Sequence, residues 1–488
     1  NGYLMVAGPT NKSTTYSFTL GGTQRFSQAI DLPNHCRTPL VSGGALSHWL
    51  SPDPAVTPRH DTAYLQATRL VPSYGATVAP DAAAVGRLAS TFTPLQLGNY
   101  TTPMGNAGYQ PSIGLLPEWD VLYLTSSSSK PYRALQFNAY SAGRYGSHFR
   151  DETTNRPLAF SSYPNLVIGG GSNGVSGTGA SSKNTYTPDS TGTTPDTWDT
   201  PHHPSIGYMA YVVTGRFYFM EEVQFVSTLM FIQNTDTNRQ FSKGVLLTHA
   251  GANTTRGAAW ALRTLAQACT VTPDTDALAA EFLSSLKANV DYYHGVYVAQ
   301  ANNPFGFVHP YTDYGTTGVF MAAPWQQNFF TAAVGYALAM EPRLVGGLSK
   351  LQEFFAWKAK SIIGMLGGTA PTDYLYRDAG QYTYAVAPSD TPDWEGGTGP
   401  WYPDWGAIYR ATMATANPGV AGDLRGGNFP EATSYLGNLQ PAIAYAVEHK
   451  IPGASDAYQR MMSAGNWAQF QVAFNVDPVW GVRPFVGP

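Results

Sequence analysis

Charged residues are scarce in this chain of 488 residues. Asp, Glu, Lys and Arg together make up 12% of the sequence, about half of their share in a typical globular protein. The net charge is −4, and no long run of Lys or Arg occurs. We therefore expect no nucleic-acid partner, because such proteins carry a basic stripe. No apolar run is long enough to cross a bilayer, so no membrane span is expected either.

Cysteine is almost missing as well. Cys36 and Cys269 are the two cysteines of the chain, too few for a disulfide framework. We expect both to be buried thiols, with a single bridge between them as the alternative. The first residues, NGYLMVAG, read as part of a strand, so we expect an upstream segment before them.

Aromatic residues, by contrast, are abundant. They make up 13% of the chain, with 30 Tyr and 11 Trp, and 50 Gly and 36 Pro accompany them. Aromatic faces stack on the apolar faces of sugars, so low charge with many aromatics is typical of a secreted, periplasmic or cell-surface protein that meets carbohydrate. A large aromatic core is the alternative explanation.

The hydrophobic pattern divides the chain into two parts. Residues 1–78 are predicted to form a small β-rich layer, with strands in TTYSFTL (14–20) and TAYLQATRLV (62–71). Residues 79–488 change to a helical period, interrupted by a Gly/Ser-rich insert near 169–198. Helical hairpins recur in this part; they cover residues 117–145, 203–232, 255–300, 323–366 and 430–466, with one further helix after Trp401.

Each hairpin has an apolar face that it cannot bury alone. Hairpins repeated every 40–60 residues or so must stack side by side to hide these faces. The stack either closes into an α/α toroid or stays an open solenoid. The loops between hairpins are long, polar and aromatic, whereas the turns within them are short, which indicates one functional rim. The predicted fold is therefore mainly α: an α/α toroid with a small N-terminal β-rich layer.

The candidate catalytic residues lie in the stretch 199–263. A histidine at the mouth of a helix can act as a general base or orient a carboxylate. Tyrosine can protonate a leaving oxygen, and arginine binds carboxylates in a bidentate manner. The candidates are His202, His203, Tyr208, Tyr211 and Arg256. Asp199 precedes His202 by three residues and is expected to orient its ring.

Other polar and aromatic residues at helix starts and loops are candidates for substrate binding. Core packing, a helix-start charge or a surface salt bridge is the alternative explanation for each of them. These candidates are His148, Arg150, Glu222, Trp260, His309, Tyr311, Tyr314, Trp325 and Gln326.

The segment HPSIGYMAYVVTGRFYFMEEVQF, followed by RGAAWALRTLAQA, resembles helical hairpins of α/α-toroid carbohydrate-active enzymes. With its early His, downstream Arg and nearby Tyr, it is most similar to toroidal polysaccharide lyases of the alginate and heparinase type. The resemblance implies β-elimination at a uronic acid of a polysaccharide substrate. Arg256 and a histidine would neutralise the C5 carboxylate, His202 or a tyrosine would remove the α-proton, and Tyr208 or Tyr211 would protonate the leaving oxygen.

No cofactor is expected for this chemistry, and no Cys/His zinc pattern is present. A divalent metal held by Asp199, His202 and His203 stays an alternative.

Two other functions stay open. A glycoside hydrolase would use two carboxylates, about 5 Å apart for a retaining and about 6.5–9.5 Å apart for an inverting mechanism. Its candidates are Asp151, Glu152, Asp199, Glu222, Asp313 and Glu395. A non-catalytic glycan-binding surface protein would instead show an aromatic groove without converging titratable groups.

Overall fold

The structure is a computed structural model of the chain. It describes residues 12–43, 56–75, 78–100, 110–168, 186, 198–250, 254–315, 318–341, 344, 347–413, 422–425 and 436–487. The strand expected at residues 1–8 and nearly all of the insert near 169–198 lie outside these residues. Within them, fourteen α-helices and four strands make the chain mainly helical, as predicted.

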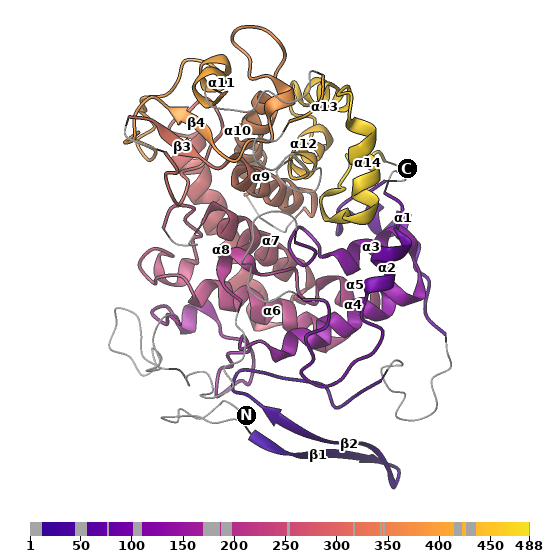
Figure 1. Ribbon diagram of the computed structural model, residues 1–488. Coiled ribbons are helices and arrows are strands. Elements are labelled where there is room, and N and C mark those ends of the chain that lie inside the picture. The colour runs from indigo at the N-terminus through magenta and orange to yellow at the C-terminus, as the bar shows by residue number, and fades with distance from the viewer. Residues whose placement is uncertain are drawn as a thin grey trace.

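The N-terminal part contains a two-stranded antiparallel sheet that projects from the lower end of the helical body (Figure 1). Strand β1 (Lys12–Leu20) pairs with β2 (Thr23–Leu32). Gly21 and Gly22 join them with φ angles of 58° and 76°. Positive φ at both central residues matches the right-handed twist of the strands, and glycine adopts it without strain. The strand predicted over 14–20 is confirmed.

The strand predicted over 62–71 is wrong. Thr62–Ala67 form helix α1, and Asp61 caps its start by accepting a hydrogen bond from the backbone nitrogen of Tyr64 at 3.0 Å. A capping aspartate stabilises the first turn of a helix by about 1 kcal/mol. This local signal outweighs the β preference of the aromatic and branched residues that follow.

The helical segments predicted after residue 79 are confirmed. The first helices are α2 (Ala82–Arg87), α3 (Glu118–Ser126), α4 (Ser129–Ser141), α5 (Tyr208–Thr214) and α6 (Phe217–Ile232). Then follow α7 (Thr255–Val271), α8 (Ala277–Tyr293), α9 (Pro324–Ala339), α10 (Leu348–Met365), α11 (Trp405–Met413), α12 (Leu439–Glu448) and α13 (Ala454–Met462). Helix α14 (Trp467–Val476) and a second small sheet, β3 (Phe320–Ala322) with β4 (Tyr384–Ala387), have no counterpart in the predictions.

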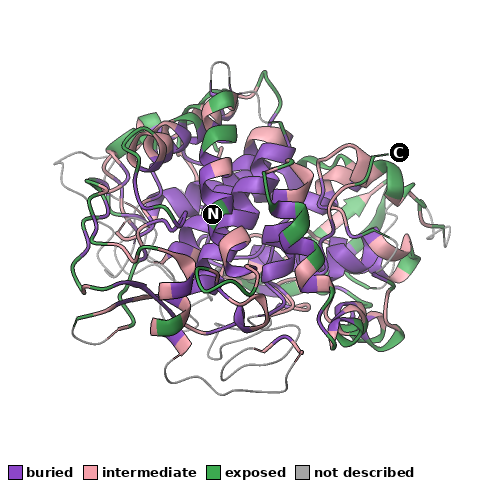
Figure 2. Ribbon diagram, turned by 90° about the horizontal axis from the view of Figure 1, so that it is seen from above, coloured by how far each residue is buried: buried purple, intermediate pink, exposed green. Residues whose placement is uncertain are grey.

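Three buried helices form the inner layer of the molecule. Helix α7 packs along α9, and α9 packs along α12. Most residues of these helices are buried, whereas α8, α10 and α13 bury one face and expose the other. Figure 2 shows the same division for the whole molecule, with buried helices at its centre and mixed colours at its edge. A helix that is apolar on all sides belongs in a core, and an amphipathic helix covers it.

The inner helices begin at the same end of the molecule. The backbone nitrogen of Arg256, at the start of α7, donates to Oε1 of Gln326, in the first turn of α9, at 3.0 Å. Nδ2 of Asn328, also near the start of α9, donates to Oδ1 of Asn438, directly before α12, at 3.0 Å. Helices that pack along one another and touch at their first turns are parallel. The described residues directly before α7, α9 and α12 therefore lie at one rim.

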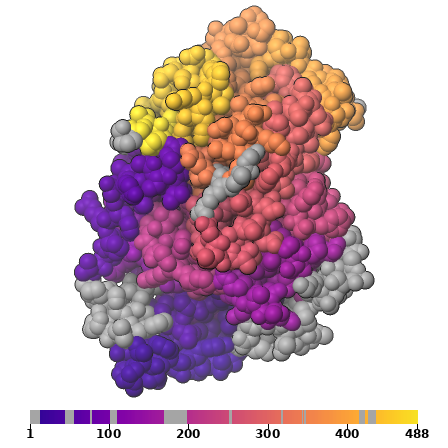
Figure 3. All heavy atoms as spheres, turned by 180° about the vertical axis from the view of Figure 1, so that it is seen from behind, coloured from indigo at the N-terminus to yellow at the C-terminus, as the bar shows by residue number. Residues whose placement is uncertain are grey.

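The C-terminal segment packs against the N-terminal helices. The backbone nitrogen of Asp81 donates to the carbonyl of Asn475 at 3.3 Å, and that of Arg483 donates to the carbonyl of Ser73 at 2.7 Å. The C-terminal helices adjoin the segment around α1–α3 in Figure 1, and the same neighbourhood is visible from behind in Figure 3. The last helices thus return to the first ones.

Both cysteines are free thiols. Cys36 is buried, and its Sγ donates to the carbonyl of Arg144 at 2.9 Å. Burial raises the pKa of the Cys269 thiol far above its ordinary value. The predicted buried thiol is confirmed for Cys36, whereas Cys269 is half-buried, and the alternative bridge is wrong. Among the described helices, none combines the length and the apolar character needed to cross a membrane.

Lys358 on α10 is a fully buried lysine. Its Nζ donates to the carbonyl of Gly306 at 2.8 Å and to Oγ of Ser361 at 3.0 Å. Burial holds the pKa of Lys358 well below its ordinary value. The unfolded chain therefore binds a proton at Lys358 over a pH range in which the folded chain does not.

This difference predicts a pH-dependent stability. Wherever the unfolded state binds more protons, stability rises with pH. Relative to Lys358→Met, the wild type should gain up to about 1.4 kcal/mol of unfolding free energy per pH unit as the pH rises from the lowered pKa of folded Lys358 toward its ordinary value of 10.5. Urea unfolding of both proteins at several pH values measures this gain. Lys360→Met, at an exposed position of the same helix, is the control, and parallel pH profiles of Lys358→Met and wild type would contradict the prediction.

Candidate functional site

Five of the predicted site residues meet at the rim where the inner helices begin. They come from the loop before α5, the first turns of α7 and α9, and the loop before β3. We call this group the rim site; it consists of His202, Arg256, Tyr314, Trp325 and Gln326. The contacts that hold it together are side-chain hydrogen bonds and ring contacts between residues far apart in the sequence.

A chain of polar contacts runs through one half of the rim site. Nδ1 of His202 lies 2.8 Å from both carboxylate oxygens of Asp199, and its Nε2 lies 2.8 Å from a terminal nitrogen of Arg256. A guanidinium can only donate, so Nε2 accepts and the ring proton sits on Nδ1. The Asp199 carboxylate thus orients the His202 ring, and Nε2 faces Arg256. The His202 side chain keeps 21% of its surface exposed, so this base is accessible.

Aromatic and amide side chains form the other half. The Arg256 guanidinium lies over the Trp325 ring, 5.4 Å from its centroid, which adds a cation–π attraction. Oε1 of Gln326 accepts from the Arg256 backbone, and its Nε2 donates to the Tyr314 hydroxyl at 3.0 Å. Gln326 thereby fixes an arginine and a tyrosine relative to each other.

Tyr314 presents its hydroxyl at this site from the loop before β3. Asp313 Oδ1 accepts from the backbone nitrogens of Gly315 and Met321, both at 2.8 Å, which holds the loop in shape. Partial burial and the neighbouring Tyr382 raise the pKa of Tyr314, while Arg256 opposes this shift. A tyrosine in this state is protonated at neutral pH and can donate a proton.

Three of the predicted binding residues lie elsewhere, in a buried ion-pair network. Its members are Arg37, His148, Arg150, Arg156, Glu221 and Glu222. Glu222 is fully buried; Arg37 Nε donates to it at 2.7 Å and His148 Nε2 lies 2.9 Å away. Arg37 and His148 hold the pKa of Glu222 at about 2, although burial itself acts in the opposite direction.

This placement corrects the roles expected for His148, Arg150 and Glu222. Arg150 binds Glu221 through both terminal nitrogens, at 3.1 and 3.2 Å. The network ties the segments around residues 37 and 150 to α6. Its charged groups pair with one another, so the network joins these segments of the fold.

Two predicted catalytic residues and one binding residue are also buried. His203 uses both ring nitrogens inside the protein, on the carbonyl of Thr200 at 2.8 Å and on Oγ1 of Thr264 at 3.1 Å. Tyr208 donates to the carbonyl of Leu70 at 2.7 Å, and the Trp260 ring packs against Phe329. All three have an exposed fraction of 0%. A substrate therefore does not reach them, and His203 offers no free nitrogen to a metal shared with Asp199 and His202.

The remaining candidates lie in different surroundings. Tyr211 is half-buried against the core. Tyr311 is 47% exposed on the loop that also carries Tyr314. Asp151 accepts from the Tyr163 hydroxyl at 2.6 Å and from two backbone nitrogens of its own turn, and Glu152 is exposed in that turn. Asp151 and Asp313 each accept backbone hydrogen bonds that stabilise their own loops, and Glu152 lies beside Asp151.

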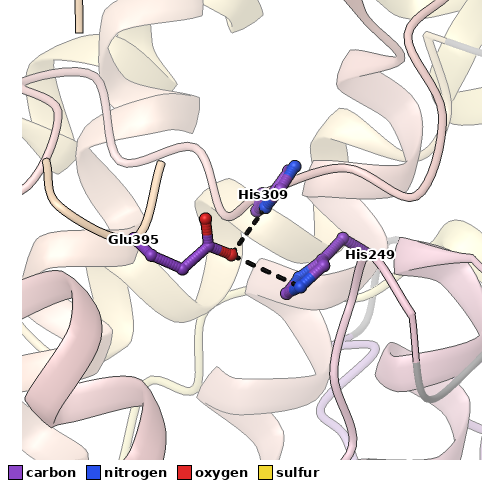
Figure 4. A group of neighbouring side chains, drawn as sticks. All are labelled: His249, His309 and Glu395. Carbon is purple, nitrogen blue, oxygen red and sulfur yellow. Dashed lines mark hydrogen bonds and ion pairs between the residues drawn. The ribbon is translucent and has the colours of Figure 1, made fainter. Parts of the chain in front are cut away.

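A second group of titratable residues lies on the same side of the inner helices. Figure 4 shows His249, His309 and Glu395, which point toward one another from three different loops. Oε1 of Glu395 lies 2.9 Å from Nδ1 of His309 and 3.3 Å from Nε2 of His249. The hydrogen bond from His309 lowers the pKa of Glu395, and burial lowers the pKa of His249. His309, predicted to bind substrate, is thus placed with partners that were not predicted.

A pocket of about 1040 Å³ lies away from both groups, on the outer face of α10. Its lining includes Tyr297, Trp357, Lys360 and Trp405, and none of the predicted site residues. Its charged lining residues do not converge on one another, so we do not assign the chemistry to it.

Two residues of these groups, Tyr382 and His249, were not predicted from the sequence. Tyr382 packs edge-on against Tyr314 at 5.9 Å and lies 6.0 Å from Trp325, but it comes from a loop without helical or strand period. His249 lies seven residues before Arg256, in the loop that leads into the same inner helix. The rule that such loops share one rim, which selected His309, would have selected His249 as well.

Comparison of the chain with family models, with curated proteins and with solved structures gives no match. The function is therefore argued from the geometry of these residues alone.

Proposed function

We propose that this protein is a polysaccharide lyase that cleaves a uronic-acid-containing glycan by β-elimination at the rim site. The observation that carries the proposal is the chain of contacts from Asp199 through His202 to Arg256. In this chain an imidazole oriented by a carboxylate lies directly beside a guanidinium. β-Elimination next to a carboxylate needs this pair, because the cation that binds the carboxylate also acidifies the proton that the base removes.

Arg256 is the group that would bind the uronate carboxylate. Its fork of donors matches a carboxylate in a bidentate manner, and the parallel starts of α7 and α9 add partial positive charge at the same end. A carboxylate held there brings the adjacent C5–H close to Nε2 of His202. Neutralising the carboxylate stabilises the charge that develops when this proton leaves.

The elimination then needs a base and an acid. When Arg256 turns its donors to the substrate carboxylate, it releases the lone pair on Nε2 of His202. Nε2 then takes the C5 proton, the C–H electrons form the double bond between C4 and C5, and the C4–O bond breaks. Tyr314 gives its proton to the leaving oxygen; its raised pKa keeps the hydroxyl protonated until the C4–O bond breaks. Tyr314 thus has the proton-donating role that the resemblance to toroidal lyases implied for Tyr208 or Tyr211. Trp325 and Tyr382 offer ring faces beside these groups.

We also propose that the helical body is an α/α toroid. The inner helices α7, α9 and α12 are parallel, the outer helices cover them, and the C-terminal segment packs on the first helices. A closed ring of helical hairpins makes contacts of these three kinds, because its inner helices are parallel, its outer helices cover them and its last segment meets its first. A secreted, periplasmic or cell-surface location fits a polysaccharide substrate, and the low charge and high aromatic content of the chain support it.

The test is incubation of the purified protein with alginate, glucuronan, pectate, hyaluronan, heparan sulfate and ulvan. A lyase produces an unsaturated uronate, which raises the ultraviolet absorbance. We expect this rise with at least one glycan, and its loss in His202→Ala. New reducing ends without the absorbance would contradict elimination and favour a hydrolase that uses carboxylates such as Asp199 and Glu395. Binding without either product would favour a non-catalytic glycan-binding protein.

A further inference from the structure

Two histidines and one carboxylate outside the proposed lyase chemistry converge between three loops. His249 precedes α7, His309 precedes β3 and α9, and Glu395 follows β4. Each offers one ligand atom, and these atoms all lie within 4.8 Å of one another. The imidazole rings are stacked, with centroids 4.2 Å apart and an angle of 14° between their planes (Figure 4). Ordinary surface histidines repel one another when charged and have no reason to gather in this way.

We propose that His249, His309 and Glu395 bind one divalent transition-metal ion, with zinc as its probe. Two imidazoles and one carboxylate are a ligand set that zinc accepts in sites with three protein ligands. Zinc bonds to nitrogen and oxygen are about 2.0–2.2 Å long, so neighbouring ligands in a tetrahedron are about 3.3 Å apart. The distances of 2.9 and 3.3 Å from Glu395 to the two rings are close to that spacing.

The surrounding contacts hold the three ligands in place. The Thr248 hydroxyl donates to the carbonyl of His309, and the Tyr297 hydroxyl accepts from its backbone nitrogen at 2.9 Å. The Trp394 ring lies parallel to the His309 ring, 5.3 Å away. On the Glu395 side, Asp393 closes its loop by accepting from the backbone of Gly396 at 2.7 Å. Supporting contacts of this kind orient metal ligands and contribute to affinity.

One observation at His249 points to a missing partner. Its Nδ1 is buried and has no hydrogen-bond partner among the described residues. A buried polar atom left in this state is costly. Because the lone pairs of parallel rings do not converge, one imidazole must turn about its Cβ–Cγ bond when the metal binds. Both side chains are about a quarter exposed, at 24% and 23%, and the contacts named above fix the loops that carry them through backbone atoms.

The ligand set also selects the metal. Calcium and magnesium prefer sites made of oxygen atoms, whereas imidazole nitrogen favours zinc, copper or nickel. Three protein ligands leave one position of a tetrahedral ion open for water or for an oxygen of a bound glycan. The ion would join the loops before α7 and α9 with the loop after β4.

The experiment uses the full chain without a histidine tag, treated with a chelator and then freed of it. We expect calorimetric titration to show one zinc ion per chain, a rise in Tm with zinc concentration, and the visible absorption of tetrahedral cobalt(II) after cobalt addition. His249→Ala, His309→Ala and Glu395→Gln should each weaken zinc binding by more than about 100-fold, since even outer partners of metal ligands contribute about 10- to 100-fold.

His294→Ala is the matched control. His294 also pairs with a glutamate, Glu353, at 2.8 Å and is similarly buried, but it has no second histidine in its group. This variant should bind zinc like the wild type. The proposal is overturned if the wild type binds no zinc, if zinc binding persists in all three ligand variants, or if calcium displaces zinc. The wild-type titration decides the matter even if one variant fails to fold, and it does not depend on lyase activity.

Discussion

Arg256→Met is expected to lower kcat/KM on the cleaved glycan by about 10³-fold. The guanidinium is the group that would neutralise the substrate carboxylate, and removing one such donor of transition-state stabilisation typically costs about 10²- to 10³-fold. Arg256 also donates to Nε2 of His202, so its loss additionally frees the base to turn. The measurement is the initial rate of unsaturated uronate formation on the glycan that the panel identifies.

Arg256→Lys separates charge from geometry. Lysine keeps the positive charge but lacks the planar fork, so we expect it to recover part of the rate and not all of it. Arg410→Met is the control, because this exposed arginine on α11 donates to the carbonyl of Pro371, away from the rim site. Wild-type rates in Arg256→Met would remove Arg256 from the mechanism. Melting temperatures of all variants show whether a lost rate reflects a lost fold.

The part of the site that could be predicted from the sequence depends on helix starts. Arg256, Trp325 and Gln326 all lie in the first turn of an inner helix. Parallel inner helices bring their first turns together, so a pattern that locates the turns also locates these side chains. His202 and Asp199 are three residues apart, and their contact is local.

The part that could not be predicted depends on side-chain direction and distant partners. His202 and His203 are adjacent, but one faces the rim and the other faces Thr264 in the core. Glu222 looked like a helix-start charge, because nothing in the sequence reveals that Arg37, 185 residues away, would bind it. The strand predicted over 62–71 is also wrong, because the hydrogen bond by which Asp61 caps α1 decides the local structure.

Glu222→Gln is expected to cause the largest loss of stability. Breaking a buried ion pair by removing one partner costs about 3–5 kcal/mol, because the other charges stay buried without full compensation. The pKa offers an independent measure. Glu222 has a pKa of about 2 in the folded protein and 4.5 as its ordinary value, and each pKa unit corresponds to about 1.4 kcal/mol, which gives about 3 kcal/mol.

The sign of the pH dependence follows from the lowered pKa. The stabilisation by Glu222 is fully present above its unfolded value near 4.5, and it is lost as the pH falls toward 2. Urea unfolding should therefore show a steep loss of wild-type stability in this acid range and a flatter profile for Glu222→Gln. Glu152→Gln, an exposed carboxylate, is the control and should follow the wild type. If Glu222→Gln unfolds at the wild-type urea concentration, the network does not stabilise the fold, and the buried glutamate would need a functional explanation instead.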